Sequence, residues 1–171
     1  MFSIPVAYFL MMVLVAASNY LVQFPINDWL TWGALPYPMT FLVTELTNRF
    51  YGPKQARKVV YVGFALAVLL SMSLATPRIA LASGLAFFCS QLLDIYVFTK
   101  IRQSAWWIAP LCASGLASLV DTVIFWNVAF YGENLPYLTW ACGDLTFKCL
   151  MDIALLSPFR FIIRSKVNLA N

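Results

Sequence analysis

Charged side chains recur at helical spacing inside long apolar stretches of this sequence. Asp144, Lys148 and Asp152 are spaced i, i+4 and i+8, so a helix places them on one face. Glu45 and Arg49 have the i, i+4 spacing of an ion pair along one helix. A third stripe, with spacing i, i+4, i+7 and i+8, consists of Ser114, Ser118, Asp121 and Thr122. Such stripes can bind a polar molecule, or they can only hold helices together through hydrogen bonds.

Catalysis and metal binding are poorly supported by the residue types present. The chain has no histidine, which is the commonest metal ligand and general base. It has no GxxxxGK[ST] phosphate loop, and its cysteines form no CxxC pair. We interpret the four cysteines as buried small hydrophobic residues: Cys89, Cys112, Cys142 and Cys149. We therefore expect neither an enzyme nor a cofactor or metal ion.

The composition identifies the kind of protein that carries these stripes. Of 171 residues, 62% are apolar and 11% are charged, whereas soluble domains are roughly 45–50% apolar and about 25% charged. A domain of this size cannot hide so much apolar surface from water. We expect an integral membrane protein, in which a net charge of +4 reports orientation and not binding to nucleic acid.

Six apolar segments predict an all-α, polytopic membrane protein whose single domain covers 1–171. The first segment lacks a basic start and is long enough to span, so we expect a membrane span and not a cleaved signal peptide. In the second segment, Pro36 and Pro38 predict that the helix proper begins near Pro38, after an irregular entry that lines a cavity or lies in a wet loop. The six predicted transmembrane helices are 2–24, 32–50, 59–75, 79–98, 106–131 and 137–163.

Basic residues sort to one side of this six-span arrangement. Nine of the eleven lie in the connections after the second and fourth segments and at the C-terminal end: Arg49, Lys54, Arg57, Lys58, Lys100, Arg102, Arg160, Arg164 and Lys166. Arg78 alone lies on the opposite side, and Lys148 lies within a span. Because cytoplasmic loops are enriched in Lys and Arg, both termini are predicted to be cytoplasmic.

The polar residues that are energetically costly at membrane depth predict a common interior site. Charged groups at membrane depth face a partner or a cavity, so the stripes of four or five helices are expected to point at one another. Asp121 has no basic neighbour on its own helix and needs a partner from elsewhere. Asp144 with Lys148, and Glu45 with Arg49, could instead be self-neutralised pairs.

Several runs of residues resemble the queuosine precursor transporter family, also called the vitamin uptake transporter family. The similar runs are 18–20, 32–33, 40–48, 51–58, 76–83, 90–98 and 118–125, together with Lys148. The resemblance implies uptake of 7-cyano-7-deazaguanine and 7-aminomethyl-7-deazaguanine across the bacterial inner membrane. It also implies a six-helix fold similar to the substrate-binding subunits of energy-coupling-factor transporters. The connection into Arg78 is tighter than in that family, which could place Arg78 at the outer mouth.

The side chains can supply the groups that a deazaguanine base requires. The base presents two adjacent donors beside one carbonyl, and a carboxylate can accept both donors. The candidate carboxylates are Glu45, Asp94, Asp121 and Asp144. The candidate donors to the carbonyl are Asn19, Asn48, Gln91, Arg78 and Lys148. The candidate stacking residues are Trp32, Tyr37, Phe87 and Trp126.

Two aspects of the mechanism stay open at this point. A buried carboxylate such as Asp121 could carry a proton, or the base could simply equilibrate across the membrane. The alternative function is a substrate-capture subunit that needs a separate ATPase module, docked on small residues such as Ala113 and Ala117. The expected partners are the substrate and the lipid bilayer, and the sequence leaves open whether the protein is a homodimer.

Overall fold

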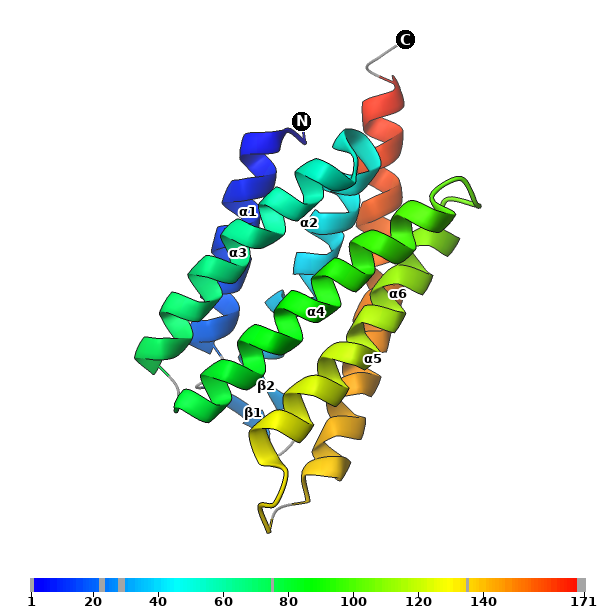
Figure 1. Cartoon of the computed structure of the whole chain (residues 1–171). Helices are drawn as coiled ribbons and strands as arrows, with labels where there is room; N and C mark the ends of the chain where they lie inside the picture. Colours follow the sequence, from blue (N-terminus) through cyan, green and yellow to red (C-terminus); the bar gives the residue numbers. More distant parts are fainter. Residues whose placement is uncertain (1, 22–23, 28–29, 75, 135, 169–171) are drawn as a thin grey trace.

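The fold is a bundle of long helices with a small hairpin at one end (Figure 1). The computed structural model describes residues 2–21, 24–27, 30–74, 76–134 and 136–168. These residues form six α-helices, one 3-10 turn and two short strands. In chain order the elements are α1 (Ile4–Leu21), β1 (Pro25–Asn27), β2 (Leu30–Thr31), η1 (Trp32–Ala34), α2 (Pro36–Tyr51), α3 (Pro53–Leu74), α4 (Pro77–Ile101), α5 (Ile108–Phe130) and α6 (Tyr137–Asn168).

Helix α2 lies at the centre of the bundle. It contacts all five other helices, while α1, α3, α4, α5 and α6 follow one another around it. Residues 40–48 of α2 are all buried, although they include threonines, Glu45 and Asn48. A helix with polar residues around most of its circumference is stable here because the other helices shield it from the surroundings.

Both described ends of the chain lie at the same end of the bundle (Figure 1). The turns between α2 and α3 and between α4 and α5 lie there too, so the basic residues gather at this end. Gly52 makes the first of these turns with a φ of 82°, and its N–H caps α2 by bonding the Asn48 carbonyl. Pro53 then starts α3. The predicted sorting of basic residues is thus a property of the fold, although the side chain of Lys166 lies outside the described part.

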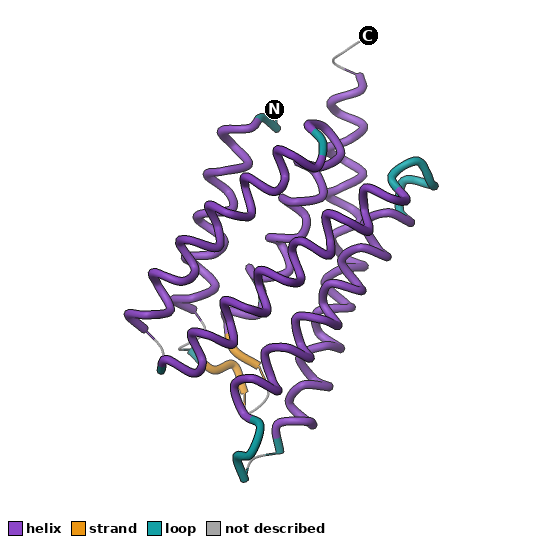
Figure 2. The backbone as a smooth tube through the Cα atoms, in the orientation of Figure 1, coloured by secondary structure: helices purple, strands orange, loops and turns teal. Residues whose placement is uncertain are grey.

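The opposite end carries the hairpin, drawn as strands in Figure 2. Strands β1 and β2 pair antiparallel, with Pro25 opposite Thr31. The η1 turn follows, and the Ser18 hydroxyl of α1 donates to the Gly33 carbonyl at 3.0 Å. The irregular entry predicted before the second helix is therefore present, but α2 begins at Pro36, two residues before the expected Pro38.

Some predicted boundaries differ from the observed ones. Helix α3 begins at Pro53 and not at residue 59, because the basic stretch 54–58 continues the helix into the polar end of the bundle. Helix α6 extends to Asn168, beyond the predicted end at 163. The predicted end of the first span includes residues 22–23, which lie outside the described residues.

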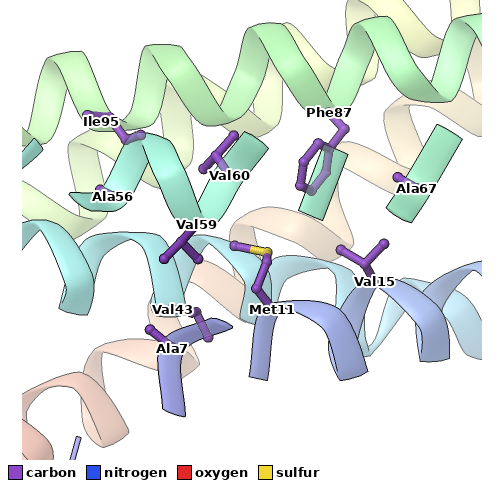
Figure 3. Packing of buried hydrophobic residues seen from close by; sticks show 10 residues of the cluster. All are labelled: Ala7, Met11, Val15, Val43, Ala56, Val59, Val60, Ala67, Phe87 and Ile95. Atoms are coloured by element: carbon purple, nitrogen blue, oxygen red, sulfur yellow. The ribbon is translucent and has the colours of Figure 1, made fainter. Parts of the chain in front are cut away.

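Two apolar clusters hold the bundle together on either side of α2. One joins α1 to α3 and α4, with Met11, Val59 and Phe87 buried against one another (Figure 3). The other lies among α2, α4, α5 and α6 and includes Phe98 and Phe159. These clusters fix α2 laterally and thereby position its polar side chains.

Four of the described helices, α1, α3, α4 and α5, are long and apolar enough to cross a membrane. Helix α2 has only 16 residues, and α6 carries the Asp144, Lys148 and Asp152 stripe. The chain is therefore a multi-pass membrane protein with at least these apolar helices.

Candidate functional site

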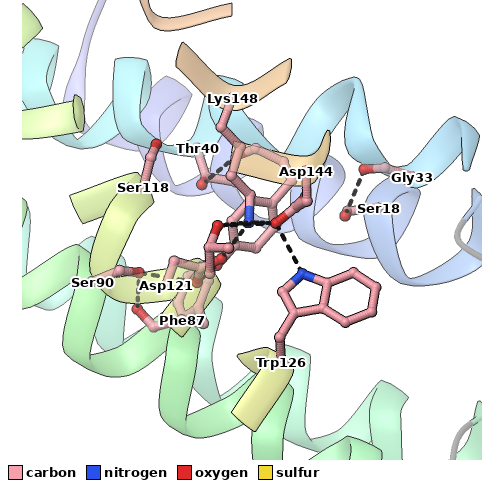
Figure 4. Close-up of polar contacts among 12 residues, drawn as sticks. Ser18, Gly33, Thr40, Phe87, Ser90, Ser118, Asp121, Trp126, Asp144 and Lys148 are labelled. Carbon is pink, nitrogen blue, oxygen red and sulfur yellow. Dashed lines mark hydrogen bonds and ion pairs between the residues drawn. The ribbon is translucent and has the colours of Figure 1, made fainter. Parts of the chain in front are cut away.

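Lys148 on α6 is the centre of a buried charge cluster (Figure 4). Its Nζ lies 2.8 Å from Oδ2 of Asp121 on α5 and 2.5 Å from Oδ2 of Asp144. The exposed fractions of the three side chains are 8% for Lys148, 5% for Asp121 and 18% for Asp144. The predicted pair of Asp144 and Lys148 is confirmed, and Lys148 is the partner that Asp121 required from another helix.

Asp121 is held by hydroxyl groups from two further helices. The Tyr37 hydroxyl of α2 donates to Asp121 Oδ1, and the Ser90 hydroxyl of α4 donates to the same oxygen at 3.3 Å. Tyr37 stands in the first turn of α2, which Pro36 starts. Four helices therefore converge on this carboxylate, and Lys148 Nζ also lies 5.4 Å from the centre of the Tyr37 ring.

Asp144 differs from Asp121 because all of its observed bonds fall on one oxygen. Oδ2 accepts from Lys148, from the Thr122 hydroxyl at 3.0 Å and from the Trp126 Nε1–H at 3.4 Å. Within the described residues, no donor is bonded to Asp144 Oδ1. This oxygen belongs to the most exposed of the three charged side chains, so it is the free acceptor of the cluster.

The cluster has two carboxylates for one ammonium group. A buried excess of negative charge is costly unless hydrogen-bond donors or a further cation compensate it. Tyr37, Ser90, Thr122 and Trp126 supply neutral donors. The arrangement therefore favours a ligand that brings additional N–H donors.

Gln91 and Asn48 join α2 to α4. The Gln91 amide donates to Thr40 at 2.7 Å and accepts from Thr44 at 2.6 Å. The Asn48 amide donates to the Ile95 carbonyl at 3.1 Å and to Thr99 at 2.9 Å. Both predicted donors thus bond helix partners here and stabilise the central helix.

Glu45 and Asp94 form a second group with Asp152, which we call the acid cluster. The Glu45 carboxyl lies within hydrogen-bonding reach of Asp94, and all three side chains are at least 97% buried. The predicted pair of Glu45 and Arg49 is wrong. Arg49 instead donates to the Arg102 carbonyl at 2.5 Å, because its position in the last turn of α2 lets it reach the α4 C-terminus.

Three other predicted residues lie away from the Lys148 cluster. Arg78 bonds Glu133 at 3.0 Å and the Val128 carbonyl at the hairpin end of the bundle. Asn19 accepts from Ser71 at 3.0 Å, and the Trp32 side chain is half exposed. Phe87 is buried and meets the Tyr37 ring edge-on at 6.4 Å, so it supports the site from behind.

The cysteines lie elsewhere than the sequence predicts, and three further polar residues reach the clusters. The four cysteines are exposed on the outside of the bundle, so the prediction that they are buried is wrong; an apolar run in a membrane helix can face lipid as well as the core. Ser90, Thr122 and Asp152 touch the clusters but were not among the candidates. The i+4 spacing of Asp152 from Lys148 was the signal that could have identified it.

Comparisons with known proteins agree on one family. A family model described as "Putative vitamin uptake transporter" matches residues 31–76 and 70–163. A "Probable queuosine precursor transporter" of Haemophilus influenzae is 35% identical over 186 residues, which cover 85% of this chain and 79% of the relative. A "Queuosine precursor transporter" of Escherichia coli is 32% identical, covering 86% and 80%.

A third relative, from Bacillus subtilis, is named "Probable queuosine precursor transporter" and is 34% identical over 130 residues, which cover 60% of this chain and 57% of the relative. No solved structure matches the chain. All three relatives carry transporter names, in agreement with the expectation that this chain is not an enzyme.

Proposed function

Because the chain belongs to the vitamin uptake transporter family, we propose that it carries queuosine precursors into the bacterial cell. The substrates are the deazaguanine bases 7-cyano-7-deazaguanine and 7-aminomethyl-7-deazaguanine. The protein lies in the inner membrane with six spans and both termini in the cytoplasm. In this arrangement α2 crosses the membrane inside the ring of the other five helices, and α6 belongs to that ring, with Leu150 and Phe161 exposed on its outer face.

The observation that carries this proposal is the Lys148 cluster with its free acceptor. Asp144 Oδ1 accepts the donor edge of the base, and Lys148 donates to the base carbonyl. Trp126, whose indole already bonds Asp144, offers its ring face for stacking. The ion pair and the aromatic ring thus come from α5 and α6 at one place.

Entry of the base into the proposed site requires a movement of the helices. The cavity beside α2 has a volume of about 10 Å³, which is roughly room for one water. The lining of this cavity includes Glu45 and Asp152, whereas the charged groups of the Lys148 cluster are bonded to one another. We propose that helices move apart to admit the base and that Lys148 exchanges Asp144 for the base during that movement. Alternating movement of this kind is how transporters expose a site near mid-membrane to each side in turn.

Asp121→Asn tests the site in cells that lack both their own uptake route and their own synthesis of the base. The variant keeps the side-chain shape and leaves Lys148 paired with Asp144. We expect queuosine in tRNA to fall at least about tenfold. Lys148 can exchange its bond to Asp144 for a bond to the base only while the second carboxylate, Asp121, anchors it. Thr146→Ala is the matched control, since Thr146 is exposed on α6 and bonds only its own helix.

Lys148→Ala extends this test, and protein in the membrane is quantified for each variant. Full uptake by both Asp121→Asn and Lys148→Ala would show that the cluster is only structural. Uptake by the purified protein alone in vesicles distinguishes a self-sufficient transporter from a capture subunit. The small residues suggested for an ATPase module, Ala113 and Ala117, are buried inside the bundle.

A further inference from the structure

The acid cluster lies beside the Lys148 cluster but plays no part in binding the base as proposed above. Glu45 comes from α2, Asp94 from α4 and Asp152 from α6, with exposed fractions of 3%, 0% and 3%. The hydrogen bonds of Gln91 to Thr44 and of Asn48 to the Ile95 carbonyl flank Glu45 and Asp94 on α2 and α4. These bonds join α2 to α4 on both sides of the two acids.

In the part of the chain that the structure describes, no basic side chain forms an ion pair with the acid cluster. Among the described residues, no donor bonds either oxygen of Asp94, Oε1 of Glu45 or Oδ1 of Asp152. The ammonium of Lys148 is directed to Asp121 and Asp144, and Arg49 is directed to the Arg102 carbonyl. Two ionised carboxylates facing each other in such a place repel strongly, so the pair is stable only with a shared proton.

Charged groups lie on several of the helices that pack around Glu45 and Asp94. Helix α6 contributes Asp152 and, one turn away, Lys148, whose ammonium is bonded to Asp121 and Asp144. Helix α5 contributes the Ser118 hydroxyl, which donates to Asp152 Oδ2 at 3.0 Å. The basic residues of α3 are exposed at the end of the bundle. No basic side chain in the described part of the chain therefore replaces the proton.

A small cavity reaches the acid cluster. Its lining includes Glu45, Asp152 and Ser114, and its volume of about 10 Å³ is roughly that of a single water site. The unbonded oxygens of Glu45 and Asp152 belong to side chains on this lining. A water in this space would connect the two carboxyl groups and allow a proton to move between them.

The acid cluster is also linked to the substrate site through two helices. Asp152 follows Lys148 by four residues on α6, and Ser118 precedes Asp121 by three residues on α5. When Lys148 turns from Asp144 toward a substrate, its field at Asp152 changes. The proton affinity of the acid cluster and the occupancy of the substrate site are then coupled in both directions.

We propose that Glu45 and Asp94, together with Asp152, form a proton-binding site that couples uptake of the base to inward proton movement. This inference rests on the proposed function. One proton binds to the carboxyl pair from the outside, travels with one molecule of base, and leaves on the cytoplasmic side. Transport of a neutral base then moves one positive charge inward.

The test uses purified protein in lipid vesicles with radiolabelled 7-cyano-7-deazaguanine, which is uncharged. A pH gradient, acid outside, is imposed while potassium and valinomycin clamp the membrane potential. We expect initial uptake to rise at least about fivefold over uptake without a gradient, and an internal pH dye to report proton entry only when base is present. A sodium gradient without a pH gradient is expected to have no effect.

Glu45→Gln and Asp94→Asn remove the ionisable groups with little change in shape. Both variants are expected to lose the response to the pH gradient while they still exchange labelled for unlabelled base across the membrane. Glu133→Gln is the matched control, because Glu133 is an exposed acid outside both clusters. It is expected to respond as the unchanged protein does.

The outcomes separate this inference from the proposed function. If the unchanged protein neither binds nor exchanges the base, the proposed function fails. If it exchanges the base but shows no proton entry, or responds only to sodium, the proton site is wrong and the function stands. Gradient-driven uptake by both acid variants would also overturn the inference, and so would loss of exchange in correctly folded variants. The dye measurement on the unchanged protein decides the question even if the variants do not fold.

Discussion

At the scale of single residues, Asp121 and Asp144 share one lysine but have different surroundings. Asp121 accepts bonds on both oxygens, whereas the described donors to Asp144 meet only Oδ2. The first carboxylate is therefore a fixed anchor for Lys148, and the second is the one that can change partners. The sequence shows only that Asp144 lies four residues before Lys148 and that Asp121 lies in another apolar segment.

Trp126 tests whether the substrate stacks beside Asp144. Trp126→Ala is expected to weaken base binding about tenfold or more, because stacking on an aromatic ring contributes about 1–3 kcal/mol per base. Trp126→Phe keeps a ring and loses only the Nε1–H bond to Asp144, so a change of about threefold is expected. The shift of the melting temperature with added base measures both affinities. Equal affinity for the Ala variant and the unchanged protein would show that the base does not stack there.

The residue spacings predicted some contacts and missed others for a physical reason. The i, i+4 rule was right for Asp144 and Lys148, which lie inside α6, where the ammonium reaches Asp144 as well as Asp121. It was wrong for Glu45 and Arg49, because Arg49 lies near the end of α2 and bonds a carbonyl on another helix. Contacts between helices, such as Lys148 with Asp121, depend on helix placement, which spacing along one chain segment does not contain.

At the scale of elements, the close approach of α1 and α3 depends on one glycine. A Cβ added at Gly63 would lie 2.7 Å from Cγ of Met11, which is buried in the apolar cluster of Figure 3. The absence of a side chain at this position lets the two helices pack as they do. This contact helps to hold α1 and α3 in place around α2.

Gly63→Ala is therefore expected to destabilise the protein by about 1–3 kcal/mol, the usual cost of overpacking a close contact. Gly115→Ala on α5 is the control, since a Cβ there meets nothing within 4 Å. It is expected to be neutral or slightly stabilising because alanine favours helix. Thermal unfolding in detergent measures both variants, and an equal loss in both would contradict the packing argument.

The elements were predicted from the sequence to different degrees. Helices α1, α3, α4 and α5 follow from their apolar lengths, and Pro36 and Pro53 start α2 and α3 as prolines commonly do. The hairpin between 25 and 31 could not be predicted, since strands of three and two residues leave no alternating pattern. The acid cluster was also beyond the sequence, because its members come from three helices.

At the scale of the whole molecule, the two ends of the bundle differ in charge. The end with both described termini carries the basic connections, and the hairpin end carries the bond of Arg78 to Glu133 (Figure 1). The Lys148 cluster, which we propose as the substrate site, lies toward the hairpin end of α6, and Asp152 of the acid cluster lies one turn further along this helix. We propose that base and proton enter from the outside at the hairpin end, and the order of the two sites along α6 agrees with that direction.

Cysteine labelling in intact cells tests that orientation. In a variant whose own cysteines are replaced by alanine, Glu133→Cys is expected to react with a membrane-impermeant maleimide. Ser104→Cys, in the exposed turn between α4 and α5, is expected to react only after the cells are permeabilised. This result is expected because the positive-inside rule places the connections rich in Lys and Arg in the cytoplasm. Labelling of Ser104→Cys in intact cells would reverse the assigned orientation.

The central position of α2 also constrains how the protein is made. The ribosome completes α2 before α4, α5 and α6 exist, yet residues 40–48 of α2 are shielded only when those helices surround it. A helix that carries Glu45 and Asn48 is poorly solvated by lipid, so we expect it to wait in the insertion machinery or at the membrane surface until its neighbours emerge. Final assembly would then come late in synthesis, when α6 covers the last open side of α2.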